Sequence, residues 1–142
     1  MRTVPKPKRE PSISSLKEKA RHVFSRYIRM RDGLETTGSM EYSECFTCDN
    51  SLPIQELHAG HYIHNKNAVF FHEKNVHAQC RACNYYRNGE PEKYKAHLIE
   101  KYGPGIITEL EELSHPIKRW KRHELESLLG YYKEKIKKME GV

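Results

Sequence analysis

The four cysteines of this 142-residue chain all lie in two short pairs, Cys45-Phe-Thr-Cys48 and Cys80-Arg-Ala-Cys83. Two CxxC turns with no cysteine left over are typical of a zinc site built from four thiolates, because each turn supplies two ligands. The basic N-terminus has no apolar stretch after it, so we expect no secretory signal, which argues against a disulfide framework. Since four thiolates complete a tetrahedral shell, we expect Cys45, Cys48, Cys80 and Cys83 to bind a structural zinc ion.

The 31 residues between Cys48 and Cys80 are more than a simple zinc ribbon needs, which is roughly 15 to 20. They must therefore form a substructure of their own, held at both ends by the metal. This segment contains "HAGHYIHNK" (58–66) and "EKNVHAQC" (73–80). Rigid placement matters little to a surface loop and greatly to an active site, so the histidines of this segment are the candidates for chemistry.

The pattern of apolar residues and turn formers predicts an α+β chain in four parts. Residues 1–11, with three prolines among lysines and arginines, are expected to be a flexible basic arm. A serine-capped helix is expected at 12–32, ended by Gly33. Residues 45–89 should form the zinc-stapled core, with strands at 57–63 and 75–80 and a short helix at 81–88. Residues 90–142 carry three apolar stripes at helical spacing and should form a helical region that packs against the core.

The charge distribution points to a polyanionic partner. The net charge is +6, and ten of the 25 Lys and Arg residues lie within residues 1–31, against only two acidic residues there. A basic arm followed by a basic helix is typical of nucleic-acid binding, although a solvated helix face has the same composition. No run of about 18 apolar residues exists, so we expect an intracellular protein without a membrane partner.

The stretches "AGHY" and "EKNVHAQCRACN" resemble the HNH endonucleases, also called the His-Me finger or ββα-metal class. Together with "FSRYIRMRD", "KYGPG" and "RHELESLLGYYKEKI" they are similar, in the same order and over residues 15–139, to the phage NinG/Rap recombination endonuclease family. The resemblance implies a ββα-metal core that uses Mg²⁺ or Mn²⁺ to hydrolyse phosphodiesters in branched DNA such as Holliday junctions and D-loops. It also implies the cytoplasm of a bacterial host cell as the location.

The resemblance implies a role for each position of the HNH pattern. His61, at the end of the first strand, corresponds to the general base that takes a proton from water. Asn75 corresponds to the residue that holds the loop between the strands and so orients His61. Asn84 stands where many members have histidine, and its amide oxygen would ligate the catalytic cation. The alternatives are a hydrogen-bonded strand histidine, a turn asparagine and a helix cap.

This sequence departs from the family's pattern at Gly60, where many HNH enzymes place a metal-binding aspartate. We expect His58 to be the second metal ligand instead. Because side chains of a strand alternate between its faces, His58 reaches the side of His61 only through a β-bulge, which Gly60 would permit. His64 is expected to contact phosphate or water, and His77 is either a ligand or a buried strand residue.

Basic residues around this pattern are expected to bind the DNA backbone without reading its sequence. They are Lys66, Arg81 and Arg87 beside the core and Lys17 and Arg21 on the first helix, together with His64. Symmetric cutting of a four-way junction needs two active sites, so we expect a homodimer, formed through the C-terminal helices. The alternatives are a zinc-stabilised DNA-binding accessory protein without catalysis, and an HNH nuclease that acts on linear DNA.

Overall fold

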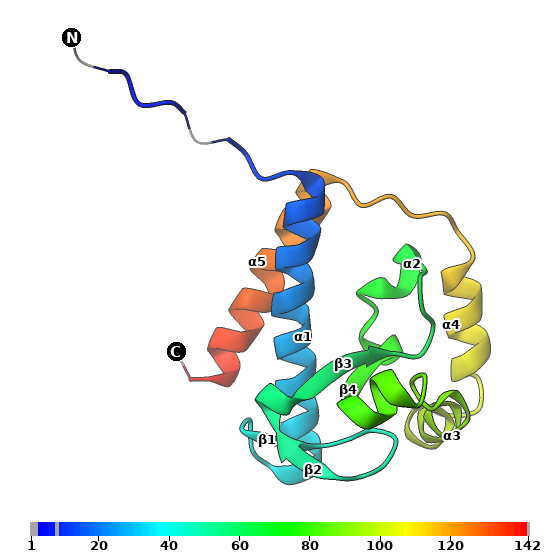
Figure 1. The fold of residues 1–142 in the computed structure, drawn as a ribbon. Coiled ribbons are helices and arrows are strands. Elements are labelled where there is room, and N and C mark those ends of the chain that lie inside the picture. The colour runs from blue at the N-terminus through cyan, green and yellow to red at the C-terminus, as the bar shows by residue number, and fades with distance from the viewer. Residues whose placement is uncertain (1–2, 8, 142) are drawn as a thin grey trace.

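The computed structural model describes residues 3–7 and 9–141, and it confirms a mixed α+β architecture. Figure 1 shows a long helix on one side, a small hairpin in the centre and two helices on the other side. The described residues before Ser12 have no regular secondary structure, while residues 1, 2 and 8 of the expected arm lie outside the described residues. The elements are α1 (Ile13–Thr37), β1 (Tyr42–Glu44), β2 (Ser51–Pro53), η1 (Ile54–Glu56), β3 (Leu57–His61), α2 (Asn67–Phe70), η2 (Glu73–Asn75), β4 (Val76–Cys80), η3 (Ala82–Tyr86), α3 (Pro91–Tyr102), α4 (Ile106–Ser114) and α5 (Arg122–Met139).

Helix α1 begins as the sequence predicts but continues past its expected end. The Ser12 hydroxyl accepts a hydrogen bond from the Ser15 N–H (3.0 Å) and caps the first turn. The helix then passes through Gly33 and ends at Gly38, which adopts a left-handed φ of 76°. Gly33 has a different role, because a Cβ there would lie 2.5 Å from the Ser39 carbonyl oxygen and 2.7 Å from that of Tyr42. The expected end at residue 32 was therefore wrong: this glycine permits close packing rather than ending the helix.

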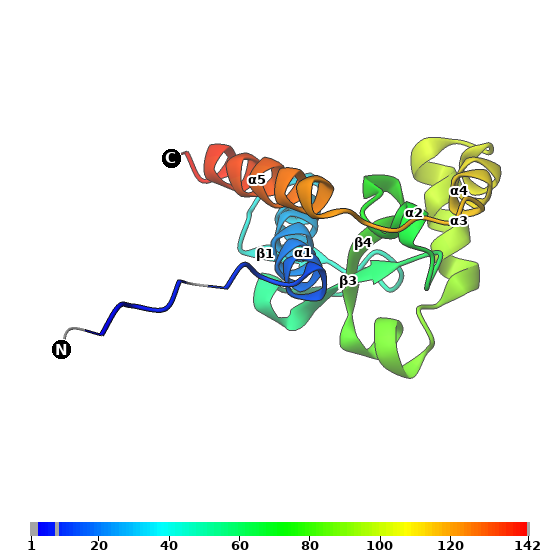
Figure 2. The same cartoon turned by 90° about the horizontal axis from the view of Figure 1, so that it is seen from above.

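The central hairpin is formed by β3 and β4, which pair antiparallel from Leu57 opposite Cys80 to His61 opposite Val76. In two perpendicular views it lies between α1 on one side and α3 and α4 on the other (Figures 1 and 2). Strands β1 and β2 form a second, separate hairpin that the sequence did not predict. Its turn carries the first cysteine pair, so both hairpins lead into the cysteine cluster.

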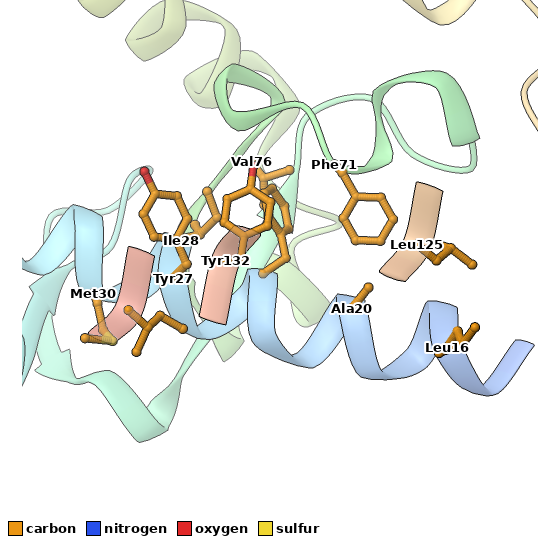
Figure 3. Close-up of a cluster of buried hydrophobic side chains, with 11 residues drawn as sticks. Leu16, Ala20, Tyr27, Ile28, Met30, Phe71, Val76, Leu125 and Tyr132 are labelled. Atoms are coloured by element: carbon orange, nitrogen blue, oxygen red, sulfur yellow. The ribbon is translucent and has the colours of Figure 1, made fainter. Parts of the chain in front are cut away.

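Helix α1 packs against α5 on one face and against the central hairpin on another, and both contacts share one apolar cluster (Figure 3). Phe24 lies at its centre, with edge-to-face contacts to Phe71 and Tyr132 at centroid distances of 5.4 and 4.9 Å. A separate cluster joins α3 to α4 through Tyr94, Leu98 and Leu110. The apolar stripes of the C-terminal helices thus serve packing, as predicted. None of the described helices is long and apolar enough to cross a membrane.

A buried ion pair near the C-terminal end of α1 fixes the helix to the outer edge of β4. Asp32 Oδ2 accepts a hydrogen bond from the Ala78 N–H (2.7 Å), and its Oδ1 accepts one from Arg31 Nε (2.8 Å). The Ala78 carbonyl in turn accepts the Phe46 N–H (2.7 Å). Because both backbone groups of Ala78 are satisfied from outside the hairpin, the edge of β4 is covered at this point, and α1 has a fixed register against the candidate site.

Candidate functional site

The four cysteines meet, as predicted, and could hold a metal ion such as zinc. Their sulfur atoms all lie within 4.8 Å of one another, and none forms a disulfide. The Sγ atoms of Cys48 and Cys80 are 3.7 Å apart. Tetrahedral zinc with Zn–S bonds of about 2.3 Å requires sulfurs about 3.8 Å apart, so the cluster has the donor type and the dimensions that zinc needs.

The thiols of the cluster differ in their pKa: burial raises the pKa of Cys48 and of Cys80, whereas the pKa of Cys45 is lowered. Burial raises the pKa of Cys45, but hydrogen bonds from the Thr47 hydroxyl and from backbone N–H groups outweigh it and lower the pKa to about 7. The Arg87 guanidinium donates a hydrogen bond to Cys83 Sγ (3.7 Å). The cluster joins the turn of the β1–β2 hairpin to the point where β4 passes into η3. It therefore fixes the start of η3, which carries Asn84, against the central hairpin.

Asn75 holds the loop that connects β3 to β4. Its side chain is fully buried, its Oδ1 accepts the Ile63 N–H (2.8 Å), and its Nδ2 donates to the carbonyls of Ile63 (3.1 Å) and Val69 (3.2 Å). The Asn75 carbonyl also accepts the Tyr62 N–H (2.9 Å). These bonds set the path of the chain directly after His61.

His61 is the last residue of β3, and its half-buried ring packs against Phe70 at a centroid distance of 4.6 Å. Its Nε2 lies 2.9 Å from the Phe70 carbonyl oxygen. A carbonyl can only accept, so Nε2 carries the proton and Nδ1 has a free lone pair. Burial lowers the pKa of His61, although the Phe70 carbonyl opposes this. The imidazole is therefore neutral at pH 7, with Nδ1 able to take up a proton.

Asn84 and His58 contact each other beside this histidine. Asn84 Nδ2 lies 3.0 Å from His58 Nδ1, which fixes His58 Nδ1 as the acceptor. Burial lowers the pKa of His58, and the nearby charges of Arg81 and Arg29 lower it further, so this imidazole is also neutral. The pairing of β3 with β4 is unbroken through residue 60, so the expected bulge was wrong.

A cavity of about 490 Å³ lies along the free edge of β3 and brings these residues together. No residue of β4 lines it, so it is bounded by β3, α1, the Phe70 loop and η3. This position explains how His58 and His61 border one space although they alternate along a regular strand. The lining residues are Arg21, Phe24, Ser25, Arg29, Leu57, His58, Ala59, His61, Phe70 and Asn84.

The predicted DNA-binding residues fall into three groups according to the surface that they line. Arg21 lines the cavity, and Lys17 and Lys66 line an adjoining depression of about 450 Å³ that also borders Phe70. Arg81 borders a separate hollow on the other side of His58. Arg87, at the cysteine cluster, and His64, whose Nε2 would lie 3.5 Å from a Cβ at Gly89, line neither the cavity nor the depression.

The structure also resolves His77 and adds residues that the sequence analysis missed. His77 is fully buried and hydrogen-bonded through its two ring nitrogens to the hydroxyls of Tyr94 (3.1 Å) and Tyr102 (2.8 Å), so it is a structural residue of β4. Gln79, also buried in β4, reaches Gly60, and no sequence pattern identifies it. Tyr85 and Tyr86 are each 67% exposed directly after Asn84; two adjacent aromatic residues at that point were the available signal.

Comparisons with known proteins agree on one family. The family profile described as "Bacteriophage Lambda NinG protein" matches residues 6–141. "Protein ninG" of Salmonella phage P22 is 30% identical over 122 residues, covering 84% of this chain and 55% of that protein. "Protein ninG" of Escherichia phage lambda is 29% identical over the same length, with the same coverage.

The chain spans about 55% of the length of these curated relatives. No solved structure matches it significantly. The family profile covers nearly the whole chain, including the helices, both cysteine pairs and the central hairpin. This chain therefore belongs to the NinG family of bacteriophage proteins.

Proposed function

We propose that this protein is a metal-dependent endonuclease that hydrolyses phosphodiesters in branched recombination intermediates such as Holliday junctions and D-loops. The observation that carries the proposal is the cavity where a neutral imidazole with a free Nδ1, the Asn84 amide and two arginines meet. A metal-dependent nuclease needs three things in one space: a base that deprotonates the attacking water, a site for a cation, and positively charged groups that bind the phosphate. The order β3, β4, η3 supports a ββα-metal core.

Asn84 would hold a catalytic Mg²⁺ or Mn²⁺ through its amide oxygen, with His58 as the second candidate ligand. An amide oxygen is a donor that Mg²⁺ and Mn²⁺ accept. In the structure Asn84 Nδ2 donates to Nδ1 of His58 (3.0 Å), which leaves Asn84 Oδ1 directed toward Gly60, so ligation by His58 Nδ1 would require this hydrogen bond to break. When bound, the cation would neutralise charge on the phosphate and on the leaving oxygen.

His61 would accept a proton from the attacking water at Nδ1, while its Nε2–H stays bonded to the Phe70 carbonyl. Asn75 would keep this geometry by fixing the loop that carries that carbonyl. Arg21 and Arg29, two turns apart on α1, would hold the backbone phosphates on the other wall of the cavity. Products with 5′-phosphate and 3′-hydroxyl ends are expected from the family resemblance.

Lys17 and Lys66 would extend the phosphate contacts along α1 toward a second duplex arm. Such contacts make binding steeply salt-dependent, by about 0.9 units of log K per log unit of salt for each phosphate contacted. Cutting both strands of a four-way junction requires two active sites, so the proposal includes a homodimer.

Cleavage of labelled four-way junction, D-loop, linear duplex and single strand, with Mg²⁺, Mn²⁺ or EDTA, tests the proposal. We expect cation-dependent cutting of the branched substrates, loss of cutting in His61→Ala, and no loss in His22→Ala, whose side chain is 69% exposed on α1 and does not line the cavity. Intact DNA with every cation would favour the accessory protein without catalysis. Equal cutting of linear duplex would favour a general HNH nuclease, and wild-type cutting by His61→Ala would refute the assigned base.

The pH dependence of cleavage is a second test. Because the pKa of His61 is lowered from 6.5, the base is already deprotonated at neutral pH. Single-turnover rates should therefore rise with pH in the acidic range and reach half of their maximum below pH 6.5. A half-maximal rate at or above pH 6.5 would contradict the burial argument for His61.

A further inference from the structure

The space beside Gly60 is filled by the side chain of a neighbouring strand. A Cβ built on Gly60 would overlap Gln79 Oε1 and would lie 3.0 Å from Asn84 Oδ1. The two amide oxygens, one from β4 and one from η3, thus border the point where the side chain of residue 60 would begin. Many HNH enzymes place their metal-binding aspartate at this position. Gly60 has no side chain, but the amide oxygens of Gln79 and Asn84 border the same point.

The orientation of the Gln79 amide is fixed by its surroundings. Its Nε2 donates to Thr47 Oγ1 (3.1 Å) and to the Gly89 carbonyl oxygen (3.0 Å). A flipped amide would place Oε1 against the Gly89 carbonyl, where two acceptors would repel each other. Thr47 lies within the first CxxC turn, so the metal cluster itself holds Gln79 with its oxygen toward Gly60.

The Gln79 oxygen has no hydrogen-bond donor. Gln79 is fully buried, and its Oε1 is one of two buried side-chain nitrogen or oxygen atoms without a partner among the described residues. Buried acceptors are normally paired, so this oxygen has a lone pair available for a ligand. Gln79 does not itself line the cavity, but its oxygen borders Gly60 beside Oδ1 of Asn84, which does line it. Asn84 has the complementary arrangement, since its Nδ2 is bonded to His58 and its Oδ1 faces Gly60.

We propose that Gln79 Oε1 is the second protein ligand of the divalent cation, together with Asn84 Oδ1. Gln79, on β4, thus provides an oxygen next to Gly60 of β3, which has no side chain to provide one. His58 is then a positioning residue that holds Asn84 through its amide nitrogen. The inference rests on the proposed function for the role of the cation, but the binding of the cation can be measured by itself. Oxygen ligands suit Mg²⁺ and Mn²⁺ better than imidazole, and two neutral oxygens leave the remaining positions for water and substrate phosphate.

Titration of the full, zinc-loaded chain with Mn²⁺, followed by the EPR signal of the free ion, tests the ligand assignment. We expect Gln79→Ala to weaken Mn²⁺ binding by about tenfold or more, since loss of even an outer-shell partner costs about 10- to 100-fold. Gln79→Glu should tighten binding, because a carboxylate replaces a neutral amide at the same place. The matched control is Gln55→Glu, which adds the same charge at the chain's other glutamine, an exposed one, and should leave the affinity unchanged.

An exchange of side chains across the hairpin sharpens the test. Gly60→Asp alone should be destabilised by its overlap with Gln79, whereas Gly60→Asp combined with Gln79→Ala frees the space and should restore Mn²⁺ binding. Zinc content and the thermal unfolding midpoint without Mn²⁺ identify variants in which the neighbouring Cys80 site is damaged.

A zinc-loaded, folded Gln79→Ala that binds Mn²⁺ like the wild type would overturn the inference, as would the absence of Mn²⁺ binding by both the wild type and Gln79→Glu. Stronger loss in His58→Ala than in Gln79→Ala would also overturn it and make His58 the ligand. If the Mn²⁺ affinity falls in Gln79→Ala but branched DNA stays uncut, Gln79 is confirmed as a ligand and the nuclease proposal is refuted. If branched DNA is cut in a cation-dependent way but the Mn²⁺ affinity is the same in Gln79→Ala as in the wild type, the nuclease proposal stands and Gln79 is refuted as a ligand.

Discussion

Replacing Asn75 by alanine should destabilise the fold by about 3 kcal/mol. The side chain makes three hydrogen bonds to the backbone of Ile63 and Val69, at 2.8, 3.1 and 3.2 Å, and each contributes roughly 1 kcal/mol net. The substitution leaves one N–H and two carbonyls of the loop without these partners. For a chain of this size the loss corresponds to a fall in the melting temperature of about 6 to 12 °C.

Urea unfolding of the zinc-loaded protein measures the free energy, and amide hydrogen exchange at Ile63 reports on the loop itself. Protection of the Ile63 amide should fall in Asn75→Ala, because its acceptor is removed. Asn67→Ala is the matched control: this asparagine lies in the same connection, at the start of α2, and its hydrogen bonds to Lys17 (2.7 Å) and to the Lys118 carbonyl (3.1 Å) are exposed to solvent. Its replacement should therefore cost less than about 1 kcal/mol. A loss below 1 kcal/mol in Asn75→Ala with unchanged exchange at Ile63 would refute the argument that this side chain holds the loop.

Three further predictions concern the rest of the fold. Cys83→Ser, or removal of metal by a strong chelator, should lower the melting temperature by about 10 °C or more, because metal binding at such clusters is coupled to folding. A melting curve that stays unchanged when the measured zinc content is zero would contradict this. Burial lowers the pKa of His77 well below 6.5, so below pH 6.5 the unfolded chain binds more protons and stability falls as the pH falls. This one residue can change the free energy of unfolding by at most about 1.4 kcal/mol per pH unit. Chemical unfolding between pH 7 and 5 should therefore show a weaker pH dependence of stability in His77→Gln than in the wild type. Gly33→Ala should cost about 1 to 3 kcal/mol because its Cβ meets two carbonyl oxygens, whereas Gly130→Ala, with nothing within 4 Å, should stabilise α5 by about 0.5 to 1 kcal/mol; similar values for both would refute the role given to Gly33.

The parts of the fold that depend on local pattern could be predicted from the sequence. The helical stripes gave α3, α4 and α5, and the short runs around His61 and His77 gave β3 and β4, because side-chain periodicity reports which face is buried. The meeting of the cysteine pairs followed from the chemistry of the metal they suit. The resemblance to the HNH pattern singled out His61, Asn75 and Asn84 before any geometry was known.

The features that sequence reasoning missed all depend on contacts through space. Gly33 looked like a helix end because the residues that approach it come six and nine positions later, after a turn. Gly60 looked like a bulge because its neighbour Gln79 is brought there only by the pairing of β3 with β4. Asp32, near the C-terminal end of α1, gave no sign that it would bind the edge of a strand. No periodicity records such contacts.

The packing of α5 along α1 affects how the chain can fold during synthesis. Part of the apolar cover of Phe24 and its neighbours on α1 comes from Leu125, Tyr132 and Ile136, about a hundred positions later in the chain. Until α5 has left the ribosome, an apolar strip of α1 stays open to other chains or to chaperones. Contacts this distant in the sequence close slowly, so the hairpin and the cysteine cluster can assemble before the long helix acquires its final partner.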